Sequence, residues 1–503
     1  MNTIANPTRP IHLPGPRPAS ELAVVHLVAE YWPYARTGGL AEAVRGIATF
    51  QAAQGTPVTV FMPLYRSVRE SFPDLELARE PLFVQVGSRL EEARIYQPPG
   101  PRQNPRVLFI DNPGYFDRAG IYGEGGSDYA DNPLRFAFYN LAVLQVLPEL
   151  ANVPVVVHAH DWHTALASIY LRTKFSGWDT YDRMAAVFSI HNAGYQGLYA
   201  PEILDQLGLP NELFHWRWLE YFQQVNLLKG GLVFSDYATT VSPTHAHELR
   251  TQAGGFGLHH SFIAMGDRFV GIRNGIDLDV WDPATDREIA ETYSESDLSG
   301  KAACKHALQA EYGLPQYPRV PLFGMTARLV GQKGIDLLIA DDILERAESQ
   351  FIFLGAGEER YETALREIAS RLPDRVVVDT DFTEPKEHRL LAGADILLMP
   401  SLYEPCGLTQ MRAQHYGALP VARRVGGLAD TIEDQITGFL FDEYTPDDLL
   451  VAMTRATTLY RAEPGAWADH MIDAMGRDFG WASSAQRYLD VYRRALANHA
   501  AAR

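Results

Sequence analysis

The sequence is poor in cysteine, in long hydrophobic runs and in positive charge, and each shortage argues against a class of protein. Only two cysteines occur in 503 residues, Cys304 and Cys406, which favours a reducing compartment over a disulfide framework. No apolar run reaches the length of a membrane span. The net charge is −18 and no local basic cluster offsets it, which argues against nucleic-acid binding. We therefore expect a soluble, cytoplasmic protein with no nucleic-acid or membrane partner.

The N-terminal stretch likewise lacks the hydrophobic segment of a signal peptide. Residues 1–20 are rich in proline, a composition typical of a disordered tail. The remaining chain is too long for one hydrophobic core. We expect a first domain at 21–265, a second at 266–480, and a C-terminal helix at 481–503 that packs on the second domain or reaches back to the first.

Apolar runs of strand length alternate with helical patterns in both halves of the chain. The expected strands lie at 23–28, 57–63, 107–110, 154–160, 185–191 and 238–242 in the first half, and at 321–328, 351–357, 375–378, 395–401 and 419–424 in the second. Such alternation is typical of parallel sheets covered on both faces. The sequence therefore predicts an α/β fold of two doubly wound, Rossmann-like domains with an interdomain cleft, and ligands at the carboxyl ends of the strands.

Residues 395–410, DILLMPSLYEPCGLTQ, predict a buried strand, a tight turn and a helix that begins at Pro405, because proline suits the first helical position. Unpaired N–H groups at a helix start attract phosphate. Glu404 would repel a phosphate there, so we expect its carboxylate to face a neutral group rich in hydrogen-bond donors, such as a sugar. The alternative is that Glu404 only caps the helix.

Two further strand ends carry cations. The motif RTGGL combines Arg36 with Gly38 and Gly39, which would admit an anion close to the backbone. A simple tight turn explains that motif equally well. Arg328 and Lys333 share one loop of the second half and could neutralise a leaving diphosphate. The alternative for them is a solvated loop.

Two motifs bear on metals and cofactors. HAHDWH, residues 158–163, ends a buried strand, but no HExxH or CxxC motif adds further zinc ligands, so we interpret His163 as a substrate contact. Residues 353–360 resemble a dinucleotide fingerprint, yet Arg360 stands where its third glycine belongs. We therefore expect no metal, no NAD and no other cofactor.

Nine motifs occur together in a defined order. They are RTGGLAEAV, YADNPLRF, HAHDWH, IHNAGYQG, TTVSPTHAHEL, IRNGIDLDVWDPATD, ARLVGQKGIDLL, YEPCGLTQ and RRVGGLADTI. In this order the sequence resembles the bacterial glycogen synthase and plant starch synthase family, nearly end to end. The resemblance implies a GT-B fold. It also implies transfer of glucose from a nucleotide-glucose donor, with ADP-glucose expected, to the non-reducing end of an α-1,4-glucan such as glycogen, with retention of anomeric configuration.

The resemblance also assigns roles to individual residues. The implied catalytic set is His163, Arg328, Lys333 and Glu404. The implied donor-binding set is Arg36, Gly38, Gly39, Asn274, Phe382, Cys406, Gly407, Leu408 and Thr409. The implied acceptor-binding set is Tyr115, Asp131, Asn192, Tyr195 and Gln196. Within these sets Glu404 holds the sugar, and Arg328 and Lys333 hold the distal phosphate.

The sequence departs from the family pattern at three positions. Arg36 stands where the family has lysine, Asp381 stands where glycine is usual, and Arg412 stands where many related retaining transferases have a second glutamate. These departures leave two alternatives open: a non-catalytic relative that binds glucan or nucleotide-sugar, and a GT-B glucosyltransferase with a small sugar acceptor. No facing pair of carboxylates like that of a retaining glycosidase is evident, which favours attack on the face that the diphosphate leaves.

Overall fold

The computed structural model describes residues 22–150 and 154–501, so the expected tail at 1–20 lies outside the described residues. The chain forms two compact units. Unit 1 contains the described residues up to Thr239, then Gly255–Phe269 and the segment from Trp481 onward. Unit 2 contains Thr240–Gly254 and Val270–Gly480. The chain therefore crosses between the units four times, where the sequence suggested one main crossing near residue 265 and a second after residue 480.

Unit 1 is built on a nine-stranded sheet with the order β14-β13-β9-β8-β1-β2-β5-β4-β3. Its predicted strands are all present, as β1 (Ala23–Leu27), β2 (Val58–Pro63), β5 (Arg106–Asp111), β8 (Val155–His160), β9 (Met184–Ile190) and β13 (Tyr237–Thr240); the short β14 (Phe269–Gly271) was not predicted. The neighbouring pairs from β9 to β5 are parallel. Strand order reverses between β1 and β8, as it does at the switch point of a doubly wound sheet.

The sequence also missed an antiparallel hairpin at the edge of this sheet. β3 (Glu76–Val86) pairs with β4 (Arg89–Gln97), and β4 pairs antiparallel with β5. Most side chains of β3 are exposed or half-buried. The hairpin therefore lacks the continuous apolar run that identified the central strands.

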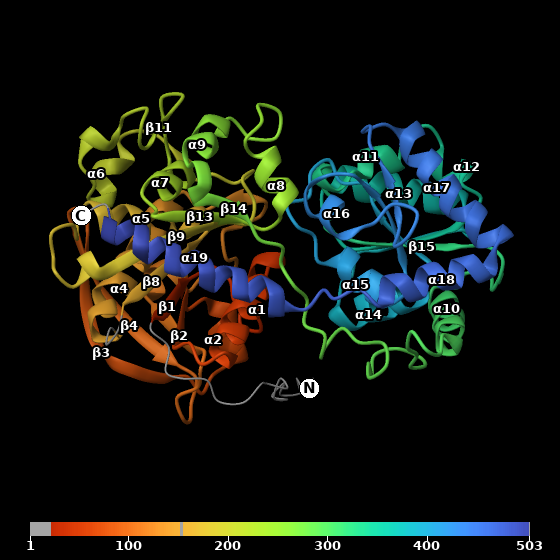
Figure 1. Cartoon of the computed structure of the whole chain (residues 1–503), viewed down its shortest axis with the longest axis horizontal. Helices are drawn as coiled ribbons and strands as arrows, with labels where there is room; N and C mark the ends of the chain where they lie inside the picture. The colour runs from red at the N-terminus through yellow and green to blue at the C-terminus, as the bar shows by residue number, and fades with distance from the viewer. Residues whose placement is uncertain (1–21, 151–153, 502–503) are drawn as a thin grey trace. The chain divides into compact units, whose positions relative to one another are not determined.

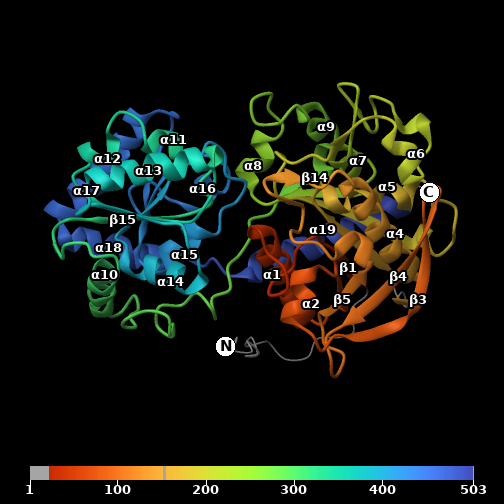
Figure 2. The same ribbon diagram turned by 180° about the vertical axis from the view of Figure 1, so that it is seen from behind.

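Helices and one small sheet complete unit 1. The helices are α1 (Gly39–Ala53), α2 (Arg66–Ser71), α3 (Pro113–Phe116), α4 (Asn132–Leu150), α5 (Ala165–Arg172), α6 (Ile203–Leu207), α7 (Leu227–Val233), α9 (His259–Ala264) and α19 (Trp481–Ala501). The small sheet pairs β12 (Gln224–Asn226) with β10 (Leu198–Tyr199) and β11 (Glu220–Tyr221), and β6 (Gly123–Glu124) pairs with β7 (Ser127–Asp128). Figures 1 and 2 show α19, in blue, lying against the red α1 and the sheet.

Unit 2 contains a six-stranded parallel sheet with the order β17-β16-β15-β18-β19-β20. Its strands are β15 (Leu322–Thr326), β16 (Gln350–Leu354), β17 (Val376–Asp379), β18 (Ile396–Met399), β19 (Leu419–Arg423) and β20 (Phe439–Phe441), and the sequence predicted all but β20. The order reverses between β15 and β18, so both sheets have the doubly wound topology and the predicted α/β class is confirmed.

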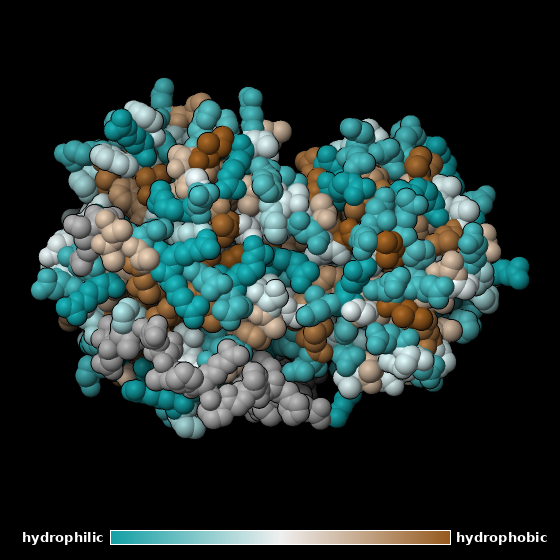
Figure 3. Space-filling model, viewed as in Figure 1, coloured by the Kyte–Doolittle hydropathy of each residue, from teal (hydrophilic) through white to brown (hydrophobic). Residues whose placement is uncertain are grey.

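The helices of unit 2 lie on both faces of its sheet (Figure 1). They are α8 (Pro243–Glu248), α10 (Ser299–Glu311), α11 (Ile335–Leu338), α12 (Ile343–Arg346), α13 (Glu359–Arg371), α14 (Glu384–Gly393), α15 (Thr409–His415), α16 (Gly426–Thr431), α17 (Pro446–Ala462) and α18 (Pro464–Met475). No helix of the described residues is apolar over enough turns to span a bilayer. On the face drawn in Figure 3, apolar residues are scattered among hydrophilic ones.

The connection after β15 depends on Gly334. Its φ is +73°, and a Cβ at this position would lie 2.0 Å from the carbonyl oxygen of Pro400, just beyond β18. We expect Gly334→Ala to lower the free energy of unfolding by roughly 2 to 4 kcal/mol, because it adds left-handed strain and a clash with backbone. Gly313→Ala is the matched control, since φ is +68° and no atom lies within 4 Å. Urea unfolding of both variants checks this, and equal losses would contradict the role of the close approach.

Candidate functional site

Unit 2 brings its predicted charged residues together at the switch point of its sheet. Lys333 ends the 3-10 turn Gly331–Lys333 after β15, and Glu404 follows β18. The Nζ of Lys333 donates to Oε2 of Glu404 at 2.6 Å, and the two side chains are only 19% and 7% exposed. The hydroxyl of Ser401 donates to the same oxygen at 3.1 Å. A half-buried ammonium and a buried carboxylate thus form one polar centre.

The predicted helix start at Pro405 is wrong. Helix α15 begins at Thr409, and its N-cap residue, Leu408, makes no side-chain cap. Gly407 has a φ of +72°, which interrupts the right-handed conformation before the helix. The amide of Gln410 donates to the carbonyl oxygens of Cys406 at 3.0 Å and Gly407 at 3.1 Å, which stabilises the turn. Glu404 therefore does not cap this helix, and its carboxylate stays with Lys333.

Two glycines of α16 support the turn that carries Glu404. The N–H of Gly427 donates to the carbonyl of Glu404 at 3.1 Å. A Cβ on Gly426 would lie 1.9 Å from that same carbonyl oxygen. Only glycine therefore allows α16 to approach so closely. The sequence quoted this motif, RRVGGLADTI, without assigning it a role.

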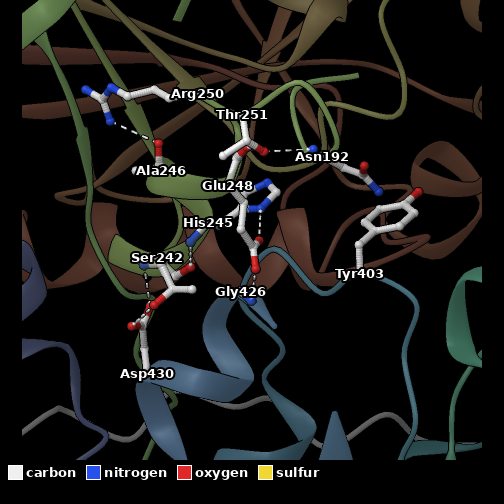
Figure 4. Close-up of polar contacts among 12 residues, drawn as sticks. Asn192, Ser242, His245, Ala246, Glu248, Arg250, Thr251, Tyr403, Gly426 and Asp430 are labelled. Carbon is white, nitrogen blue, oxygen red and sulfur yellow. Dashed lines mark hydrogen bonds and ion pairs between the residues drawn. The ribbon is translucent and has the colours of Figure 1, made fainter. Parts of the chain in front are cut away.

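The α8 segment of unit 2 holds α16 from its other side (Figure 4). The carboxylate of Glu248 accepts from the N–H of Gly426 at 2.8 Å. Asp430 accepts from the backbone N–H of Thr244 at 3.0 Å and from its hydroxyl at 2.7 Å. In Figure 4, Glu248 points down from α8 toward Gly426. Sequence reasoning missed these contacts because they join residues more than 170 positions apart.

Three other predicted donor residues of unit 2 differ in exposure. Arg328 is exposed, two positions beyond β15, and Phe382 is 40% exposed beyond β17. Asn274 is buried, and its Oδ1 has no hydrogen-bond partner among the described residues. Burial raises the pKa of the Cys406 thiol to about 12, against a hydrogen bond from the backbone of Asn274, so this thiol is not ionised. A buried acceptor without a partner is costly, which makes Asn274 a candidate ligand contact.

In unit 1 the RTGGL turn is occupied by a carboxylate that the sequence analysis did not identify. Glu30 is buried and accepts from the backbone N–H and the hydroxyl of Thr37, from the N–H of Gly38 at 3.3 Å, and from the hydroxyl of Tyr122. Gly39 opens α1. Arg36 pairs with Glu42 at 2.7 Å. The turn is thus a neutralised polar site rather than an open phosphate cradle.

His163 lies at the end of the neighbouring strand and contacts this turn through Tyr122. The two rings stack at 4.5 Å, and Phe136 meets His163 edge-on at 4.9 Å. Burial lowers the pKa of His163 to about 3, so its imidazole is neutral. Its Nδ1 is buried and has no hydrogen-bond partner among the described residues. The switch point of unit 1 therefore brings together Arg36, Gly38 and His163 with the unpredicted Glu30 and Tyr122.

The predicted acceptor residues fall into two groups. Arg118 joins the first group, since it pairs with both oxygens of Asp131 at 2.6 Å and donates to the carbonyl of Gly114, beside Tyr115. Tyr115 is buried, and its hydroxyl donates to Glu91 at 3.3 Å.

The second acceptor group lies on the loop after β9. Asn192 accepts from the N–H of Gly194 at 2.9 Å, and Tyr195 is 54% exposed. Gln196 is buried, donates to the carbonyl of Phe256 at 2.9 Å and accepts from Asn226 at 2.6 Å. The side chain of Gln196 thus holds the loop itself, and Tyr195 is the residue of this group that it presents outward.

Comparison with known proteins covers both units. The family described as Starch synthase catalytic domain matches residues 23–264, and Glycosyl transferases group 1 matches residues 320–458. Glycogen synthase from Anaeromyxobacter dehalogenans is 41% identical over 479 residues, 94% of this chain and 99% of its own. Glycogen synthase 2 from Geobacter sulfurreducens is 40% identical over 483 residues, with coverage of 94% and 99%. The solved catalytic domain of Starch Synthase IV from Arabidopsis thaliana, bound to ADP and acarbose, aligns with a TM-score of 0.86 at 33% identity, covering 95% of this chain and 100% of that chain.

Unit 1 buries several neutral imidazoles, and this makes its stability sensitive to acid. Burial lowers the pKa of His26 to about 4 and of His163 to about 3, and it lowers those of His158 and His160 further. Below pH 6.5 an unfolded histidine binds a proton that the folded one does not. Each group then removes up to about 1.4 kcal/mol of stability per pH unit on acidification toward pH 4. Burial raises the pKa of Asp161 to about 7, which offsets one histidine.

We therefore expect the free energy of unfolding to fall steeply between about pH 6.5 and pH 4, measured by urea denaturation at several pH values. His163→Gln removes one such group and should flatten the slope. His306→Gln, at an exposed position of α10, is the control and should leave the slope unchanged. A stability that does not vary with pH across this range would contradict the neutral, buried state of these imidazoles.

Proposed function

The chain belongs to the glycogen synthase and starch synthase family of GT-B glucosyltransferases, and we propose that its donor is ADP-glucose and its acceptor the non-reducing end of an α-1,4-glucan. Membership is shown by relatives about 40% identical over nearly the whole chain, and it confirms the resemblance seen in the sequence. The solved starch synthase domain is bound to ADP, which supports an adenine nucleotide in the donor. The two free, buried cysteines support a reducing compartment such as the cytoplasm.

The pair formed by Lys333 and Glu404 is the observation that carries the proposal. An ammonium has three donors, so Lys333 can bond to Glu404 and still donate to a phosphate oxygen. Glu404 keeps one carboxylate oxygen on Lys333 and can direct the other to a sugar hydroxyl. One centre at the end of β15 and β18 therefore suits both parts of a nucleotide-sugar.

The proposed chemistry is departure of the diphosphate and attack by the acceptor hydroxyl on the same face of the sugar. Lys333 and the exposed Arg328 offset the charge that develops on the leaving group. The leaving phosphate accepts the proton of the attacking hydroxyl. These cations lie on the chain itself, so the proposal includes no resident metal or other cofactor.

Neutral His163 suits contact with an uncharged sugar. Its buried Nδ1 has no partner among the described residues and is thus available to a hydroxyl. On this proposal unit 1 contributes the acceptor contacts and His163, and unit 2 contributes the donor contacts.

The first test is transfer of labelled glucose to glycogen from ADP-glucose and, separately, from UDP-glucose. We expect incorporation from ADP-glucose and its loss in Glu404→Ala, because the sugar is then no longer held. Glu367→Ala removes an exposed carboxylate of α13 and is the matched control. Incorporation from UDP-glucose alone would contradict the proposed donor. A folded protein that uses neither donor would point to the non-catalytic relative.

Lys333→Ala should slow transfer by about 3 kcal/mol of transition-state stabilisation, roughly a hundredfold in kcat, the scale of one electrostatic donor. Steady-state kinetics with ADP-glucose and glycogen measures this. Arg346→Ala removes a half-exposed cation of α12 and should leave kcat unchanged. An unaltered kcat in Lys333→Ala would rule out leaving-group stabilisation by this residue.

A further inference from the structure

A continuous chain of buried hydrogen bonds crosses unit 1 beneath its switch point. It begins at the hydroxyl of Thr239 on β13, which lies 2.5 Å from Ser189 Oγ on β9. Ser189 Oγ lies 2.6 Å from Nε2 of His158 on β8. The Nδ1 of His158 lies 2.8 Å from the hydroxyl of Tyr492, which belongs to the C-terminal helix α19.

The chain returns from α19 to the sheet through α1. The Gln51 amide donates to the Tyr492 hydroxyl at 2.8 Å, and its Oε1 lies 3.0 Å from Nε2 of His26 on β1. The Nδ1 of His26 lies 2.9 Å from Nε2 of His160, and Nδ1 of His160 lies 3.0 Å from Nε2 of His191, just after β9. Every side chain before His191 is fully buried.

The Gln51 amide fixes the direction of every bond. Its oxygen can only accept, so His26 must carry its proton on Nε2 and accept on Nδ1. His160 must then donate from Nε2, and His191 must do the same. On the other side the Tyr492 hydroxyl accepts from Gln51 and donates to His158, which therefore also carries its proton on Nε2. All four imidazoles are neutral and share one tautomer, in agreement with the pKa values that burial lowers.

The end of the chain lies at the loop of the second acceptor group. The backbone N–H of His191 donates to Oδ1 of Asp161 at 2.7 Å, and the N–H of Asn192 lies 3.4 Å from the same oxygen. Asp161 itself has φ of 58° and ψ of 177°, a conformation that is rare outside glycine. His191 is thus held at its ring by the chain and at its backbone by a strained residue two positions before His163.

We propose that Tyr492 is a positioning residue for the transfer reaction, which it serves by fixing, through this chain, His191 and the acceptor loop 192–196. This inference rests on the proposed function. The hydroxyl of Tyr492 is the link between the two halves of the chain, since it accepts from Gln51 and donates to His158. Its removal leaves two buried polar groups without partners and lets the tautomers of His26, His160 and His191 change.

A metal ion is the competing interpretation of the same imidazoles. Ligand atoms of His26, His158 and His160 lie within 4.8 Å of one another, close enough to hold a cation. Each of their six ring nitrogens, however, is already in a hydrogen bond of the chain. A cation would have to displace those bonds, so the hydrogen-bonded chain accounts for the cluster better.

The first test is the tautomeric state of the histidines in the intact protein, read from two-bond proton–nitrogen correlations with ¹⁵N-labelled histidine. We expect His26, His158, His160 and His191 all to be neutral and protonated on Nε2. Protonation on Nδ1, an imidazolium, or displacement of these signals by added Zn²⁺ would overturn the chain as described. This measurement needs no activity, so it stands even if no donor supports transfer.

The second test is kinetic. Tyr492→Phe should raise the KM for glycogen roughly 5- to 10-fold, the effect of one buried hydrogen bond, and leave the KM for the nucleotide-sugar unchanged. Gln51→Met breaks the adjacent link and should give the same pattern. Tyr488→Phe, one turn earlier in α19, removes a hydroxyl outside the chain and is the matched control. An unchanged KM for glycogen in both Tyr492→Phe and Gln51→Met, or an equal rise in Tyr488→Phe, would overturn the proposal.

Discussion

The reversal of strand order in each sheet is the constraint on which the candidate site depends. Between β1 and β8, and again between β15 and β18, adjacent parallel strands connect to helices on opposite faces, so the two loops that follow them diverge. His163 and the RTGGL turn occupy the first of these positions, and Lys333 and Glu404 occupy the second. Residues more than 70 positions apart meet because topology brings their strands together.

Burial then determines the chemistry available at each position. In unit 2 the carboxylate of Glu404 stays close to an ammonium, so a polar centre is kept inside the protein without an uncompensated charge. In unit 1 burial keeps the imidazole of His163 neutral. The two units thus offer different environments, one with charges for a phosphate and one with neutral groups for hydroxyls.

The sequence predicted the central strands and the class of fold because each of those strands is a continuous apolar run. It did not predict the hairpin of β3 and β4, whose side chains are largely exposed, nor the true start of α15, where Gly407 and the amide of Gln410 outweigh the preference of Pro405 for a first helical turn. Glu30 follows a predicted strand and could have been singled out on that ground. Tyr122 carries no such signal. The alternation in HAHDWH placed His158 and His160 on one face, but nothing local connects them with Tyr492.

The membership of α19 in unit 1 has a consequence for how the protein is made. The first strand of that unit leaves the ribosome early, yet the helix that packs on α1 and β9 is synthesised only after all of unit 2. Domains generally fold as units during synthesis, N-terminal first. Here unit 2 can complete its fold while the earlier unit still lacks a covering helix. The nascent N-terminal unit therefore keeps apolar surface and buried-to-be histidines open to solvent, and to chaperones, until its last segment arrives.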